Sequence, residues 1–172
     1  MLEKFSPNLY VKSIYHIDLD KLWNRGIRAI ITDLDNTLVA WDSPLPDQRL
    51  MEWLGMVQAK GFAVFIVSNN SRDRVDKFAK AVGIPAISKA IKPRRGAFRT
   101  ALETLGVSAT ETAVVGDQIF TDVLGGNRHG LFTILVLPVS DKEFFGTKIN
   151  RALEQMVLRR LKRRGLTDSP DD

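Results

Sequence analysis

Two kinds of pattern alternate along the chain: short apolar runs, and segments whose apolar residues recur at helical spacing. Apolar runs predict five strands, at residues 27–32, 62–67, 85–87, 113–115 and 132–136. Helical spacing predicts helices near 50–61, 72–82, 97–105 and 147–164, the last with an alternative start at 142. Strands that alternate with helices favour a parallel sheet in an α/β domain. We therefore expect one domain over residues 1–166 and a disordered tail over 167–172.

Composition narrows the classes that this domain can belong to. Of the 172 residues, 44% are hydrophobic, which is typical of a globular domain of this size. The absence of cysteine excludes disulfides and thiolate chemistry and fits a reducing compartment. Residues 1–20 lack the pattern of a signal peptide, and no apolar run reaches the length of a membrane span. These features predict a cytoplasmic location.

Chemically reactive side chains cluster where the predicted strands end. Asp33 and Asp35 follow the first strand, Ser68 and Asn69 the second, and Asp117 the fourth, while Lys92 lies at another strand–helix junction. The carboxyl ends of parallel strands share one sheet edge, where α/β proteins place their sites. Two carboxylates at the end of a buried strand are costly without a counter-charge, which a divalent cation supplies. The pattern predicts a site at this edge.

These residues, in this order, resemble the four motifs of the haloacid dehalogenase (HAD) superfamily. The residues within these motifs resemble still more closely the YqeG-type family of capless HAD phosphatases, in subfamily IIIA. The matching segments are TDLDNTLV, IVSNN, AxKP and VxGDQIxTDVLGGNRxG. The resemblance implies a Rossmann-like HAD fold, a central parallel sheet flanked by helices without a cap domain. It also implies Mg²⁺-dependent hydrolysis of phosphomonoesters through an aspartyl-phosphate.

The resemblance assigns the acidic residues to separate tasks. Asp33 is the implied nucleophile and a ligand of Mg²⁺. Asp35 is the implied general acid and base, and binds the metal through its backbone carbonyl. Asp117 is a further metal ligand, and Asp122 is a direct or water-mediated one. Thr121-Asp122 as the start of a short helix remains an alternative.

The remaining motif residues are implied to bind the phosphoryl group. Lys92 pairs with phosphoryl oxygens and keeps Asp33 ionised, and Ser68 donates a hydrogen bond to another oxygen. Asn69 belongs to the same substrate-binding set. Two alternatives stay open: Ser68 as a helix cap, with Asn69 and Ser71 as rivals, and Lys89 in place of Lys92.

Motif spacing bears on the substrate. Only 35 positions separate Asp33 from Ser68, and 24 separate Ser68 from Lys92, so neither gap accommodates a cap domain. The turn around Trp41 is then the only expected flap. An open site suits a large substrate, and eukaryotic relatives of the YqeG-type family act on phosphatidylglycerophosphate. A lipid phosphate of this kind is the specific substrate that we expect.

The C-terminal segment 147–165 predicts a basic amphipathic helix. Seven basic residues and one acidic residue lie between Lys148 and Arg164. Three interpretations remain: packing on the domain, peripheral contact with an anionic membrane, and contact with RNA. DNA binding is not expected, and the sequence does not predict an oligomeric state. The apolar stripe expected on the domain comprises Ile149, Leu153, Met156/Val157 and Leu161.

Two non-enzymatic functions compete with the phosphatase. The first is a catalytically weak HAD-fold binding protein that contacts membrane or RNA through its basic C-terminal helix. No motif residue is missing, which argues against it. The second is a receiver domain, which also uses acidic residues, Ser/Thr and Lys on a parallel sheet. Its phosphorylated aspartate follows a middle strand, and the order of motifs here is different.

Overall fold

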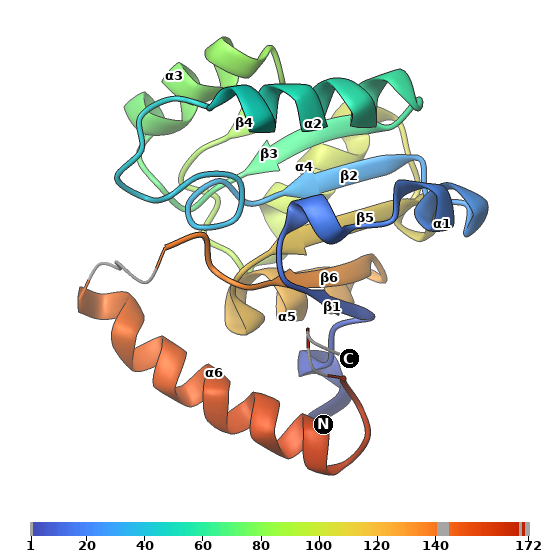
Figure 1. Cartoon of the computed structure of the whole chain (residues 1–172), viewed down its shortest axis with the longest axis vertical. Helices are drawn as coiled ribbons and strands as arrows, with labels where there is room; N and C mark the ends of the chain where they lie inside the picture. The colour runs from blue at the N-terminus through green and yellow to red at the C-terminus, as the bar shows by residue number, and fades with distance from the viewer. Residues whose placement is uncertain (1, 141–144, 169, 171–172) are drawn as a thin grey trace.

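The fold is organised around a parallel six-stranded β-sheet, seen in the computed structural model in Figure 1. The structure describes residues 2–140, 145–168 and 170. The strands lie in the order β1-β6-β5-β2-β3-β4, and all neighbouring pairs are parallel. Their bounds are Leu9–Val11 (β1), Ala29–Thr32 (β2), Ala63–Val67 (β3), Ala86–Ile87 (β4), Thr112–Gly116 (β5) and Phe132–Val136 (β6). The predicted α/β fold with a parallel sheet is confirmed.

Helices cover both faces of this sheet. They are α1 (Leu19–Asn24), α2 (Gln48–Ala59), α3 (Arg72–Val82), α4 (Arg95–Leu105), α5 (Leu124–His129) and α6 (Phe145–Arg163). Successive side chains of a strand point to opposite faces. Thus Ile30 packs in the core cluster that contains residues of α1, α2 and α3, and Ile31 packs in the cluster that contains residues of α4. Burial on both faces explains why the central strands are continuous apolar runs.

Strand β1 and helix α1 are absent from the sequence-based prediction. β1 has only three residues, all half-buried, and it extends the sheet by pairing Tyr10 with Leu135 of β6. Asp18 caps α1 by accepting a hydrogen bond from the backbone N–H of Lys21, at 3.0 Å. Elements this short carry too few residues for a periodic signal. Their position is decided by tertiary pairing with the sheet.

Helix α3 follows the expected bounds because both ends carry local signals. The Ser71 hydroxyl accepts a hydrogen bond from the backbone N–H of Arg74, and Gly83 ends the helix in the left-handed conformation, at φ 68°. Val75 and Phe78 are fully buried on the inner face. Ser71 is therefore the helix cap, and Ser68 is left for the site.

Helix α6 packs on the domain through a face that shares Val157 and Leu161 with the predicted stripe. Val157 and Leu158 contact an apolar cluster of the domain, and Leu161 is fully buried. Leu153 and Met156 are exposed, so their assignment to the packing face is corrected; the Ile149 side chain lies outside the described residues. The expected tail 167–172 falls partly outside them too, at 169, 171 and 172.

Two further features limit the architecture. In the described ranges, the connections after β2 and β3 contain the flap and helices α2 and α3, and no cap domain. No helix among the described residues combines the length and apolar character that membrane crossing requires.

Candidate active site

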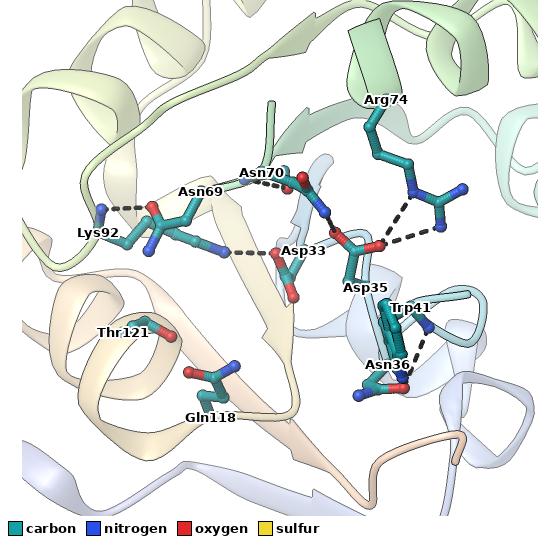
Figure 2. Close-up of a pocket in the computed structure, with 11 residues that line it drawn as sticks. Asp33, Asp35, Asn36, Trp41, Asn69, Asn70, Arg74, Lys92, Gln118 and Thr121 are labelled. Atoms are coloured by element: carbon teal, nitrogen blue, oxygen red, sulfur yellow. Dashed lines mark hydrogen bonds and ion pairs between the residues drawn. The ribbon is translucent and has the colours of Figure 1, made fainter. Parts of the chain in front are cut away.

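A cavity of about 720 Å³ opens at the carboxyl edge of the sheet (Figure 2). Loops that follow β2, β3, β4 and β5 form its wall, as expected for a site at the strand ends of an α/β sheet. Its lining residues are Asp33, Asp35, Asn36, Trp41, Ser68, Asn69, Asn70, Arg74, Lys92, Gln118 and Thr121. The cavity thus gathers residues from all four motifs or from positions next to them.

Lys92 occupies the buried centre of this site. Its Nζ lies 2.6 Å from Asp33 Oδ1 and 2.7 Å from Asp122 Oδ1. Burial alone disfavours the ammonium, but the carboxylates of Asp122 and Asp33 outweigh burial and raise the pKa of Lys92. Of the two candidate lysines, Lys92 is the one that lines the cavity. The rival Lys89 is exposed.

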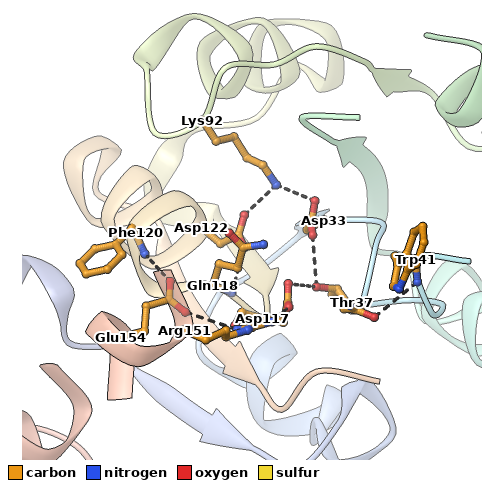
Figure 3. Close-up of polar contacts among 11 residues, drawn as sticks. Asp33, Thr37, Trp41, Lys92, Asp117, Gln118, Phe120, Asp122, Arg151 and Glu154 are labelled. Atoms are coloured by element: carbon orange, nitrogen blue, oxygen red, sulfur yellow. Dashed lines mark hydrogen bonds and ion pairs between the residues drawn. The ribbon is translucent and has the colours of Figure 1, made fainter. Parts of the chain in front are cut away.

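Three carboxylates converge beside Lys92. One oxygen each of Asp33, Asp117 and Asp122 lies within 4.8 Å of the others, and all three residues are buried. Figure 3 shows Thr37 between two of them, with its hydroxyl 3.1 Å from Asp117 Oδ1 and 3.5 Å from Asp33 Oδ2. We call Asp33, Asp117, Asp122 and Lys92 the buried cluster.

Local backbone structure places Asp122 in this cluster. It lies in a short π-helix, Ile119–Val123, and its Oδ2 accepts the backbone N–H of Gln118 at 3.2 Å. A Cβ atom on Gly116 would lie 2.2 Å from Asp122 Cγ. Only glycine therefore fits at the end of β5 when Asp122 folds back over it. The alternative that Asp122 merely starts a helix is not supported.

The buried cluster has the properties of a site for a divalent cation. Burial and the charge of Asp33 raise the pKa of Asp117 to about 8, against the opposing effect of Arg151 and with a further contribution from Asp122. Burial, opposed by Lys92 and assisted by Asp33, raises the pKa of Asp122 to about 6. Crowded carboxylates resist ionisation, and a bound cation would relieve that repulsion. Three oxygen donors also match the preference of Mg²⁺.

Asp35 lies in the same cavity but turns away from the buried cluster. Its Oδ1 accepts hydrogen bonds from Arg74 Nε at 3.2 Å and Nη2 at 3.0 Å, and its Oδ2 accepts Asn70 Nδ2 at 2.8 Å (Figure 2). Asn36, at φ 60°, turns the chain directly after it. The Asp35 side chain is therefore separate from the candidate metal ligands. Its backbone carbonyl as a ligand stays a prediction.

Helix α6 contributes an arginine that sequence reasoning assigned only to the basic surface. Arg151 Nη2 bonds to Asp117 Oδ2, and Nη1 donates to the backbone carbonyl of Asp117. Glu154 is buried, lies 3.3 Å from Arg151 Nη1 and accepts the backbone N–H of Phe120 at 3.1 Å (Figure 3). Burial raises the pKa of Glu154. The two side chains lock α6 onto the loop that carries Asp117.

The two remaining predicted residues also line the cavity. Ser68 is buried, and its Oγ accepts the backbone N–H of Asn70 at 3.1 Å, which leaves its proton available. Asn69 Oδ1 accepts the backbone N–H of Lys92 at 2.7 Å. Asn69 therefore holds the Lys92 loop against the cavity wall. The sequence-based prediction did not include Arg74, which also lines the cavity. Its position about one helical turn after the second motif was the available signal.

Comparison with known proteins shows the family of this chain. A family model described as HAD-hydrolase-like matches residues 90–141. The chain is 48% identical over 166 residues to "Probable phosphatase YqeG" of Bacillus subtilis, with 96% of each chain covered. It is 33% identical to "Phosphatidylglycerophosphate phosphatase 1, chloroplastic/mitochondrial" of Arabidopsis thaliana, over 93% of this chain and 49% of that protein.

A solved structure shares the fold. It is the "putative HAD superfamily (subfamily III A) hydrolase" of Legionella pneumophila, with a TM-score of 0.52 and 21% identity over 86% of this chain and 90% of that one. Identity this low bears on the fold alone. The family is shown by the 48% identity to the Bacillus protein over 96% of both chains. The chain belongs to the YqeG-type family of HAD-superfamily phosphatases.

Proposed function

We propose that the protein is a Mg²⁺-dependent phosphomonoester hydrolase that works through an aspartyl-phosphate on Asp33. The observation that carries the proposal is the convergence of three buried carboxylates and Lys92 at the base of an open cavity. This arrangement combines a nucleophile, a cation site and a fixed positive charge. Phosphoryl transfer depends mainly on such positioned charge.

The metal would be held by oxygen atoms alone. Carboxylates of Asp33, Asp117 and Asp122, with the backbone carbonyl of Asp35, are the proposed ligands. When bound, Mg²⁺ supplies positive charge that offsets repulsion between the nucleophile and the phosphate. Thr37 and Arg151 orient Asp117 through its two carboxylate oxygens. The Arg151 contact makes α6 part of the support of the site.

Each side chain has a defined task in the first half of the reaction. A carboxylate oxygen of Asp33 attacks phosphorus, the ester P–O bond breaks, and Asp35, protonated at the start of the cycle, transfers its proton to the leaving alkoxide. Lys92 and Ser68 bind phosphoryl oxygens, while Asn69 positions the Lys92 backbone. The product of this half is an aspartyl-phosphate on Asp33.

The second half restores the enzyme. Asp35 takes a proton from water, the water oxygen attacks phosphorus, and the bond between phosphorus and the Asp33 oxygen breaks. Asp33 returns to its carboxylate, and inorganic phosphate leaves. Arg74 and Asn70 position the Asp35 carboxylate at the cavity wall.

A phosphate on a phospholipid is the substrate that we propose. Two relatives, in Arabidopsis thaliana and Chlamydomonas reinhardtii, are named phosphatidylglycerophosphate phosphatases and align with 93% and 90% of this chain. In the described residues no cap closes the cavity, so a head group projecting from a larger assembly can reach it. Phosphatidylglycerophosphate is the specific candidate.

The test is phosphate release from a panel that includes phosphatidylglycerophosphate in detergent micelles and soluble phosphomonoesters. We expect turnover with Mg²⁺, loss of turnover with EDTA, and an acid-stable, base-labile phosphoenzyme during turnover. Preference for the lipid over soluble esters supports the substrate assignment. Mg²⁺-independent hydrolysis, or hydrolysis without a phosphoenzyme, contradicts the mechanism.

A further inference from the structure

Exposed apolar side chains lie on segments that border the cavity. Trp41 is 40% exposed and lines it, and Ile91, 58% exposed, directly precedes the buried Lys92. Leu45 and Val139 are 50% and 52% exposed. We call these four residues the apolar rim. Single exposed apolar residues are common on proteins, but a set gathered at one opening indicates an interaction surface.

The backbone conformation of Ile91 is energetically unfavourable for this residue type. Its φ is 54°, in the left-handed region, where a β-branched residue is rarely found. Because more than half of the Ile91 surface is exposed, packing of its side chain contributes little stabilisation. Glycine or asparagine would adopt this conformation more easily. An apolar side chain retained at such a position points to a role outside the folded core.

The turn that carries Ile91 is fixed to the cavity wall. The backbone N–H of Ala90 donates to the carbonyl of Ser68 at 3.0 Å, and the N–H of Lys92 donates to Asn69 Oδ1 at 2.7 Å. Both acceptors belong to cavity-lining residues. Ile91 is therefore displayed beside the opening on a rigid support.

The other rim residues are attached to the opposite side. Asn36 Oδ1 accepts the backbone N–H of Trp41 at 3.4 Å, and the Asn36 carbonyl accepts that of Val139 at 2.9 Å. Arg74 donates to the carbonyls of Ala40 and Ser43 and so holds the flap that carries Trp41. Figure 2 shows Trp41 and Lys92 on opposite sides of Asp33. The rim thus borders the cavity on two sides.

Charge near the rim favours an anionic partner. Lys89, Arg94 and Arg95 are exposed around Ile91, and none of them forms an ion pair within the described part of the chain. Two exposed carboxylates lie on the flap side, Asp42 next to Trp41 and Asp47 two positions after Leu45. Apolar tips beside unpaired cations match a phospholipid surface, where Trp favours the interface and basic residues favour anionic head groups.

We propose that the apolar rim docks on an anionic phospholipid bilayer, with Trp41 and Ile91 in the interface and Lys89, Arg94 and Arg95 on the head groups. Docking in this orientation presents the cavity to phosphates in the head-group plane. That last consequence rests on the proposed phosphatase function, while docking itself does not. The proposal differs from binding through α6, whose exposed apolar residues Leu153 and Met156 lie outside the rim.

Vesicle flotation of the full chain tests the docking surface. We expect the protein to bind vesicles that contain phosphatidylglycerol and to ignore pure phosphatidylcholine. The Trp41→Ser/Ile91→Asn double variant should lose binding by at least tenfold, and the matched α6 double variant Leu153→Ser/Met156→Ser should keep it. Absent binding to anionic vesicles, or loss in the α6 variant with retention in the rim variant, overturns the proposal.

Two further measurements separate docking from folding and from catalysis. Ile91→Asn suits the backbone, so its thermal unfolding should match the wild type, and its hydrolysis of soluble esters should be unchanged while hydrolysis of vesicle-borne lipid falls. Asp33→Asn should float as well as the wild type although it hydrolyses nothing. Failed flotation refutes docking alone, and failed hydrolysis refutes the phosphatase alone.

Fluorescence locates the contact directly. Trp53 is buried and Trp23 half-buried, so Trp41 is the tryptophan that a bilayer can reach. Brominated anionic lipids should quench part of the emission, and Trp41→Phe should abolish that quenching. Equal quenching in both proteins overturns insertion of the rim.

Discussion

Asp33 and Asp35 are two positions apart, yet they lie in opposite electrostatic settings. Asp33 shares the buried cluster with two further carboxylates, and Lys92 and Arg151 are the cations that contact the three. Asp35 forms a separate pair with Arg74, which balances its charge without help from a metal. We call Asp35 and Arg74 the open pair, because both line the solvent-open cavity.

The difference supports the proposed roles of the two aspartates. The buried cluster has an excess of negative charge and gains from a further cation, as a metal-assisted nucleophile requires. The open pair is neutral in sum and hydrogen-bonded at both carboxylate oxygens, so it gains nothing from a metal. It remains accessible for proton transfer. Environment, rather than residue type, distinguishes the two carboxylates.

Replacing each aspartate by asparagine should give the largest effects on hydrolysis, and the two variants should differ. Asp33→Asn removes the proposed nucleophile, and we expect hydrolysis to fall below detection. Asp35→Asn removes the proposed proton donor, and turnover should fall by about 10²–10⁴-fold. With an ester whose leaving group needs no proton, Asp35→Asn should accumulate phosphoenzyme and Asp33→Asn should form none. Phosphoenzyme in Asp33→Asn would contradict the assignment, and unchanged unfolding temperatures control for folding.

Lys92→Met tests how strongly the buried cluster depends on its lysine. The substitution preserves length but leaves Asp33 and Asp122 without their shared cation, so we expect the metal-free protein to lose about 3–5 kcal/mol of unfolding free energy. Urea unfolding in EDTA measures this loss. Arg72→Met, in an exposed pair with Asp76, is the matched control and should stay close to the wild type. Equal effects would remove the distinction between buried and exposed pairs.

The pH dependence of stability sharpens the same contrast. The pKa values of Asp117 and Asp122, about 8 and about 6, exceed the ordinary value near 3.8. Between about pH 4 and pH 8 the metal-free folded state therefore binds more protons than the unfolded state, and stability falls as pH rises. Urea unfolding in EDTA across this range should show the decline. Mg²⁺ binds the deprotonated carboxylates, so it should stabilise more at pH 8 than at pH 5. Metal-free stability that rises with pH contradicts the charge balance of the cluster.

Much of this site could be predicted because parallel sheets align their strand ends. Asp33, Ser68, Lys92 and Asp117 each follow an apolar run, and the topology alone brings them to one edge. Periodicity likewise predicted α3 and every strand except β1. Asp122 needed the motif spacing, since it reaches the cluster from a π-helix that has no signature in the sequence.

The contacts that support the site could not be predicted in the same way. The direction of the Asp35 side chain depends on the turn at Asn36, and Arg74 reaches it from a different loop–helix segment. Arg151 and Glu154 come from α6, more than thirty positions after Asp117, and the basic surroundings of Arg151 suggest only a surface. Such partners are chosen by tertiary packing. Residue types fix the chemistry of the site, and packing fixes its geometry.

Arg74→Gln has the smallest expected effect of these variants. It perturbs the open pair and leaves the buried cluster intact. It removes the guanidinium bonds to Asp35 and those to the flap carbonyls of Ala40 and Ser43, while the buried cluster keeps its contacts. We expect kcat to fall about tenfold, the scale of one charge-assisted hydrogen bond, with Mg²⁺ affinity unchanged.

The flap provides the second measurement for this variant. Without Arg74 the exposed segment around Trp41 loses its anchor, so limited proteolysis should cleave there faster than in the wild type. Arg72→Gln, two positions away on the exposed face of α3, should change neither kcat nor cleavage. Because Arg74 contacts Asp35 and no residue of the buried cluster, an altered Mg²⁺ affinity in Arg74→Gln would mean that the two aspartates are coupled. The open pair would then be part of the metal site, and the separation of roles between Asp33 and Asp35 would fail.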